Sequence, residues 1–325
     1  MVECGLLGLM LARLPELSCR ERIALCESVD TEAGLIEKSM SDVEVIINRK
    51  LNAFWDINTI RRTAEQDEKR ALRRGIRWVS WHDPAYPPLL REMYDPPVLL
   101  FYRGRLPDPH RPLAAVVGTR KPSPQAAAQA FGIAKDLGRA GISVVSGLAI
   151  GIDAMSHRGN IEGGGSTVAV LGSGVDEVYP SSNRPLAGRI LETGGVLFSE
   201  YPPGARPRKW TFPARNRIIS GLSRGVVIAE APQKSGALIT ARFALDQNRD
   251  LWVASAGIEI DHGRRAFDRR GTAALAADGA AVLDSASGIL EAWNIKAAET
   301  ENKTGQTASG VHLAANLAGS LGIEL

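Results

Sequence analysis

The chain has 325 residues, enough for two or three folded units at the usual domain size of about 100 to 200 residues. Hydrophobic residues make up 44% and charged residues 23%, a balance typical of globular proteins that excludes a disordered or fibrous class. No apolar run approaches the roughly 18 residues of a membrane helix, and no leader pattern opens the chain, so we expect a cytoplasmic protein without membrane contact. Cys4, Cys19 and Cys26 have no histidine nearby to complete a zinc pattern, so we expect reduced core thiols and no metal site.

The net charge of +3 is too small to indicate a nucleic-acid partner, but its distribution is uneven. In the window 184–217, seven basic residues stand against Glu192 and Glu200, a balance of +5. The seven are Arg184, Arg189, Arg206, Arg208, Lys209, Arg215 and Arg217. Such a strip suits a polyanion, although a solvated face with unrelated charges fits the composition equally well.

The first 77 residues carry apolar side chains at helical spacing, which predicts a small all-helical domain. We expect it to resemble a SAM or helix-hairpin-helix domain. Its arginines alternate with acidic residues, as on a solvated amphipathic helix. Residues 78–109 are rich in proline and aromatic residues, which favours a packed linker over a base-stacking surface.

Residues 110–290 alternate short β-branched runs with helical segments, the pattern of a parallel sheet covered by helices. We therefore predict an α/β fold with an extended Rossmann-like, doubly wound sheet, and a mobile tail at 291–325. The predicted strands are 113–117, 142–146, 167–171, 195–199, 225–229 and 250–254.

In such a sheet the ligand lies beyond the carboxyl ends of the strands, where helix N-termini present free amides. Gly118, Thr119 and Arg120 follow the first of these strands, so the Arg120 guanidinium is either a phosphate clamp or a partner in a salt bridge. The next strand runs into a turn at 146–154, where Ser146, Gly147 and Gly151 could form a nest for an anion.

Two acidic residues at this edge invite a catalytic interpretation. Asp153 and His157 are spaced i, i+4, but capping and local pairing at a helix start account for them better than acid–base chemistry. Glu230 either holds an arginine in place or acts as a catalytic carboxylate. Gly172-Ser173-Gly174 begins like a dinucleotide fingerprint, but Glu177 occupies the third glycine position and no Walker string is present, so we expect no cofactor.

Two further segments supply candidate contacts. Arg215 and Arg217 begin a helix, and their i, i+2 spacing places them on different sides, so at most one faces a shared ligand. Ser235 and Gly236 open another helix toward the same edge.

In this order the strings GTR, SGLAIGIDA, AVLGSGVDEVYPSSN, SEYPPG, FPARNRIISGLS and SGALITA resemble the DprA/Smf family over about residues 84–280. The resemblance implies a dimer that binds single-stranded DNA and helps load the RecA recombinase during natural transformation. It also places DNA contacts at Arg120 and Arg184. Three positions depart from the family pattern, namely Ile150, Ala256 and Ala273.

We therefore predict a non-enzymatic adaptor that protects single-stranded DNA and holds it by its phosphates. Arg120 and Arg184 would be the main contacts on one crevice. The alternative is a phosphoribohydrolase-like enzyme acting on nucleotides, with Glu230 as its catalytic carboxylate.

Overall fold

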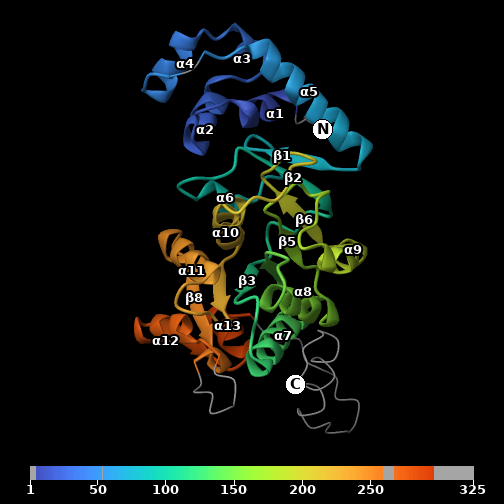
Figure 1. Cartoon of the computed structure of the whole chain (residues 1–325), viewed down its shortest axis with the longest axis vertical. Helices are drawn as coiled ribbons and strands as arrows, with labels where there is room; N and C mark the ends of the chain where they lie inside the picture. Colours follow the sequence, from blue (N-terminus) through green and yellow to red (C-terminus); the bar gives the residue numbers. More distant parts are fainter. Residues whose placement is uncertain (1–4, 53, 259–266, 296–325) are drawn as a thin grey trace.

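The computed structural model describes residues 5–52, 54–258 and 267–295 (Figure 1). The first part of the described chain is helical, as the apolar spacing predicts, with four short helices followed by a longer one. Ser18 and Ser39 start two of them as reciprocal capping boxes with Glu21 and Asp42, which satisfies amides that have no partner within the helix. The five are α1 (Leu6–Arg13), α2 (Cys19–Ser28), α3 (Glu32–Glu37), α4 (Met40–Ile47) and α5 (Ile57–Arg73).

A single nine-stranded sheet forms the body of the molecule, in the order β1-β2-β6-β5-β4-β3-β7-β8-β9. Strands β3 to β9 pair in parallel, and all six predicted strands are present with bounds shifted by at most one residue. They are β3 (Leu113–Val117), β4 (Ser143–Ser146), β5 (Val168–Val170), β6 (Val196–Ser199), β7 (Gly225–Ile228) and β8 (Asp250–Ala254), followed by β9 (Ala281–Leu283). The predicted Rossmann-like α/β class is confirmed.

The segment 78–109 does more than link the two parts. It contributes most of β1 (Arg77–Ser80) and all of β2 (Leu99–Gly104), which extend the sheet antiparallel beside β6. Leu99 and Phe101 pack with the helical module, whereas Leu100 and Tyr102 point into the opposite layer. The sequence does not predict these strands because prolines surround the short apolar run.

Helices cover both faces of the sheet, as a doubly wound fold requires. Packing against alternate strand residues divides them into two layers. One layer holds α7 (Pro124–Arg139), α8 (Ile152–Glu162), α9 (Arg184–Glu192) and α13 (Ser287–Ala292). The other holds α6 (Pro88–Arg91), α10 (Thr211–Leu222), α11 (Gly236–Asp246) and α12 (Arg270–Ala277). Two 3-10 turns, η1 (Ser181–Asn183) and η2 (Ser255–Gly257), lie in loops at the carboxyl edge.

The C-terminal boundary differs from the predicted one. Trp293 is buried and packs edge-on against Trp252, with ring centroids 5.9 Å apart, so residues 291–295 belong to the folded body rather than to a tail. The remainder of the predicted tail, residues 296–325, lies outside the described residues. Cys4 also lies outside them, whereas Cys26 is buried and Cys19 half-buried, both as free thiols.

Within the described ranges, no helix is long and apolar enough to cross a membrane. The same part of the chain holds no group of three or more His, Cys, Asp or Glu side chains arranged for a metal ion.

Candidate nucleic-acid interface

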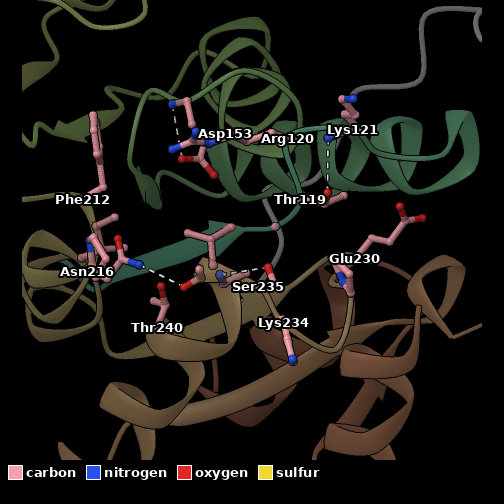
Figure 2. A pocket seen from close by; sticks show the side chains of 18 of the residues that line it. Thr119, Arg120, Lys121, Asp153, Phe212, Asn216, Glu230, Lys234, Ser235 and Thr240 are labelled. Carbon is pink, nitrogen blue, oxygen red and sulfur yellow. Dashed lines mark hydrogen bonds between the residues drawn. The ribbon is translucent and has the colours of Figure 1, made fainter. Parts of the chain in front are cut away.

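The parallel strands all end at one edge of the sheet, and a cavity of about 740 Å³ opens there. Its walls come from the loop after β3, the start of α8, the first turns of α10 and α11, and the end of β7. Figure 2 shows Thr119, Arg120 and Lys121 on one side of the cavity and Lys234, Ser235 and Thr240 on the other. The carboxyl-edge position is the one predicted for a doubly wound sheet.

The loop after β3 is held tightly at its base and open at its tip. A Cβ at Gly118 would lie 2.6 Å from Cγ1 of Ile152, so only glycine lets the chain pass there. The amide of Thr119 donates to the carbonyl of Glu230 at 2.8 Å. Arg120 is exposed, and its guanidinium lies 5.6 Å from the centroid of the Phe212 ring. The loop therefore presents a cation to the cavity from a fixed backbone.

The turn after β4 does not offer its amides to an external anion, contrary to the predicted nest. The amides of Gly147 and Ala149 both donate to Oδ2 of Asp153, at 3.1 and 3.3 Å. The hydroxyl of Ser146 donates to the carbonyl of Val116 at 2.8 Å. These groups brace the turn from within, because Asp153 already takes the place that an anion would occupy.

Gly151 has a different structural task. Its φ of +81° is a conformation that glycine adopts readily, and a Cβ there would lie 2.5 Å from the carbonyl oxygen of Thr119. The amide of the next residue, Ile152, donates to the same carbonyl at 3.2 Å. Gly151 thus brings the start of α8 against the loop that carries Arg120.

Arg215 lies in the floor of the cavity and is only 5% exposed. Its Nη1 donates to the carbonyl of Gly147 at 2.9 Å and also to the carbonyl of Val170. Burial lowers the pKa of Arg215 to about 10 and raises that of Asp153, while the opposite charges of the two groups offset part of this cost. A Cβ at Gly147 would lie 2.5 Å from the guanidinium, so that glycine makes room for Arg215.

Arg217 faces away from the cavity, as the i, i+2 spacing predicts. Its Nη2 pairs with Oε1 of Glu200 at 2.6 Å, and its Nε with Oδ2 of Asp95 at 3.1 Å. The pairing raises the pKa of Arg217 further above its ordinary value. It joins the loop after β6 to the segment before β2, and it braces that loop rather than facing a ligand.

Arg184 does not share the crevice of Arg120. It is the exposed first residue of α9, and the cavity lining does not include it. The prediction assumed neighbouring strands, but β4 lies between β3 and β5 in the sheet. Of the seven basic residues in the window 184–217, only Lys209 and Arg215 line the cavity.

The start of α11 forms the opposite wall, as predicted. Ser235 caps the helix by accepting from the amide of Ala237 at 3.2 Å, and the carbonyl of Gly236 accepts from Nδ2 of Asn216 at 3.0 Å. Lys234 precedes the cap and is exposed. The positive end of the α11 dipole and the exposed Lys234 therefore both lie at the cavity, an arrangement that favours an anion.

Glu230 is 1% exposed, and both of its oxygens are engaged. Oε1 accepts from the amide of Ser123 at 3.0 Å, and Oε2 from the hydroxyl of Ser123 at 2.5 Å. Nε of Arg269 lies 3.3 Å from Oε2. The contact with Arg269 matches the predicted structural role, in which Glu230 holds an arginine, and the contacts with Ser123 additionally anchor the start of α7.

His157 is equally unsuited to proton transfer at the surface. It is fully buried, its Nδ1 lies 2.8 Å from Oγ1 of Thr167, and burial lowers its pKa to about 3. Asp153 caps its own turn instead of pairing with this ring. The predicted local role therefore holds for Asp153, which accepts from the turn before α8, but not for His157, which contacts the more distant Thr167.

Among the cavity residues that were not predicted as contacts, five are cationic or aromatic. Lys121, Lys209 and Lys234 are exposed cations, and the rings of Tyr179 and Phe212 pack with centroids 5.5 Å apart. Each lysine adjoins or lies near a predicted motif, so its position in the sequence could have identified it as a candidate phosphate contact. The aromatic pair joins two loops distant in sequence, and no local pattern indicates it.

Comparison with known proteins identifies the family. Residues 77–294 match the family model of DNA recombination-mediator protein A. Protein Smf of Synechocystis is 42% identical over 229 residues, covering 68% of this chain and 54% of that protein. DNA processing protein DprA of Streptococcus pneumoniae is 46% identical over 176 residues, covering 54% of this chain and 62% of that protein. The matched part thus spans little more than half the length of these relatives.

Solved structures agree with this assignment. The structure of Streptococcus pneumoniae DprA superposes with a TM-score of 0.71 at 32% identity and covers 88% of this chain and 97% of that one. The Helicobacter pylori protein, whose structure addresses its single-stranded DNA binding mode, gives a TM-score of 0.56 at 25% identity over 67% of this chain and 96% of that one. The chain belongs to the DNA recombination-mediator protein A family, the DprA/Smf proteins.

Proposed function

We propose that this chain binds single-stranded DNA in the cavity at the carboxyl edge of its sheet. The observation that carries the proposal is the set of four exposed cations around this cavity, Arg120, Lys121, Lys209 and Lys234. Of the acidic residues in the lining, Asp153 and Glu230 are buried and engaged, which leaves Asp268 exposed. The rim is therefore positive, as phosphate binding requires.

The aromatic residues favour a single strand over a duplex. Phe212 contacts both the Arg120 guanidinium and the Tyr179 ring, and both rings line the cavity. An unpaired base can stack on such a ring, whereas the bases of a duplex are already stacked on one another. Phosphates would lie against the cations and the first turns of α10 and α11, and a base would lie toward Phe212.

Family membership extends the proposal to the cellular role. The single-stranded DNA binding studied for the Helicobacter pylori relative supports the same ligand here. We propose that the chain acts in the cytoplasm as a homodimer, protects incoming DNA and helps load the RecA recombinase during natural transformation. Within this role, the cavity would bind the DNA, whereas the second copy of the chain and RecA would contact other surfaces of the protein.

Binding rather than catalysis suits the site. A nucleotide hydrolase would need Glu230 free to approach its substrate, but both carboxylate oxygens are held by Ser123 and Arg269. His157 is buried and stays neutral above about pH 3. The cavity therefore supplies charge and stacking without an available acid–base pair.

Fluorescence anisotropy with labelled single-stranded DNA, duplex DNA and RNA of the same length tests the proposal. We expect single-stranded DNA to bind more tightly than the duplex. We also expect its log affinity to fall linearly with log salt between about 50 and 200 mM, because counterions are released from the phosphates. Equal affinity for the duplex, or affinity independent of salt, would contradict a phosphate-binding site for single strands.

A further inference from the structure

Trp210 is a large aromatic side chain left on the surface beside the cavity. It directly precedes α10 and is 58% exposed, whereas the other five tryptophans of the chain are buried or half-buried. A single exposed apolar residue is common on any protein and carries no function by itself. Its fixed geometry and its neighbours distinguish this one.

The indole packs against a second aromatic ring and lies on a turn closed by hydrogen bonds. It packs edge-on against Tyr201, with ring centroids 5.9 Å apart and planes at 76°. The turn that carries it is closed by Thr211, whose amide donates to the carbonyl of Arg208 at 3.0 Å and whose hydroxyl donates to it at 2.8 Å. A ring already ordered in this way loses little conformational entropy when a ligand stacks on it.

The same turn connects Trp210 to the cavity. Lys209 and Phe212, on either side of it in sequence, both line the cavity. Arg206 and Arg208 are exposed just before them, so the surroundings of the indole are basic. One aromatic pair, Tyr179–Phe212, thus belongs to the cavity, while neither ring of the pair Tyr201–Trp210 lines it.

We infer that the Tyr201–Trp210 pair is an outer shelf on which a base of single-stranded DNA stacks, next to the nucleotides held in the cavity. This inference rests on the proposed function and adds a second contact region to it. Arg206 and Arg208 are the cations available to the phosphates beside that base. Stacking on an indole accepts any base, so the shelf extends the footprint without adding sequence preference.

Binding of oligothymidylates of increasing length to the full chain tests the shelf, with anisotropy and tryptophan emission recorded together. We expect longer oligonucleotides to quench the emission of the wild type. Trp210→Ala should weaken their binding on the order of tenfold, the effect of one lost base stack, and leave the shortest bound oligonucleotide unaffected. Trp210→Phe should retain most of the affinity and remove the quenching. Phe54→Ala, at an aromatic residue 86% exposed in the helical module, should change neither signal.

Wild-type affinity in folded Trp210→Ala at every length would overturn the shelf and leave the cavity site standing. An equal loss at all lengths, including the shortest, would also overturn it, because Trp210 would then act within the cavity itself. Failure of the wild type to bind any oligonucleotide would overturn the proposed function together with this inference.

Discussion

Replacing Arg120 by alanine isolates the central contact of the proposed site. The residue is exposed at the tip of the loop after β3, and that loop is fixed through backbone hydrogen bonds rather than through this side chain. Its guanidinium stacks over Phe212 at 5.6 Å, and an exposed cation–π contact of this kind is worth about 0.5 to 1 kcal/mol. The substitution should therefore lower the free energy of unfolding by no more than about 1 kcal/mol.

The loss in binding should be larger than the loss in stability. A charge-assisted hydrogen bond to a phosphate contributes about 1.5 to 3 kcal/mol, which corresponds to a rise in Kd of roughly ten- to hundredfold. Removing one phosphate contact to a single strand should also reduce the slope of log affinity against log salt by about 0.7. Arg120→Lys keeps the charge but not the planar fork, so it should restore the salt slope and only part of the affinity.

Salt titrations by anisotropy measure both quantities. Two other exposed arginines serve as controls, Arg184 on α9 and Arg62 in the helical module. Neither lines the cavity, so alanine at either position should change the Kd much less than Arg120→Ala. If Arg120→Ala kept wild-type affinity and salt slope while folded, or if Arg184→Ala cost more, the cavity would not be the phosphate site.

Three further predictions concern the support of the site. Gly151→Ala should lower the free energy of unfolding by about 3 kcal/mol, because the new Cβ would clash with the loop that carries Arg120. Gly164 has the same φ of +81°, but a Cβ there would have no atom within 4 Å, so Gly164→Ala should lower it by only about 1 kcal/mol. Equal losses in a denaturant titration would contradict the close approach at Gly151. His157 takes up a proton near pH 6.5 in the unfolded chain but only near pH 3 in the folded chain, so the stability that the neutral ring contributes is complete above pH 6.5 and is lost as the pH falls. Between pH 7 and pH 5 the free energy of unfolding of the wild type should therefore fall by about 2 kcal/mol more than that of His157→Gln. Parallel losses in the two proteins would refute this prediction. Glu230→Gln should lower the melting temperature, because it removes the charge that pairs with Arg269. Neither the wild type nor this variant should release free base from a nucleoside monophosphate. Release by the wild type that the variant abolishes would favour the alternative of a nucleotide-hydrolysing enzyme.

The sequence predicts six of the seven parallel strands because these are short, largely buried apolar runs; β9, with two exposed residues, was read only as an apolar segment. Segments such as 113–117 and 250–254 read as strands without any knowledge of their neighbours. The antiparallel strands β1 and β2 were missed, since the proline-rich flanks obscure the apolar run at 98–102. A short apolar run is therefore recognised as a strand only where its flanking residues are not rich in proline.

The site is predicted less completely because it depends on strand order and burial. Arg184 was placed beside Arg120, but the order of the sheet separates their strands, and order is not a local property of the sequence. Arg215 becomes a buried brace, and the amide of Gly147 is taken by Asp153, through contacts that only the folded chain creates. Parts of the predicted loops do line the cavity, since small residues and helix starts mark the carboxyl edge.

Hydrogen–deuterium exchange of the full chain with and without single-stranded DNA tests the location of the site most directly. We predict that DNA slows exchange in the segments 118–121, 209–213 and 234–237, which form the walls of the cavity. We predict little change in α9 and in the helices of the N-terminal module, which the cavity lining excludes. Protection concentrated in α9 or in the N-terminal helices, with the three cavity segments unchanged, would contradict the account.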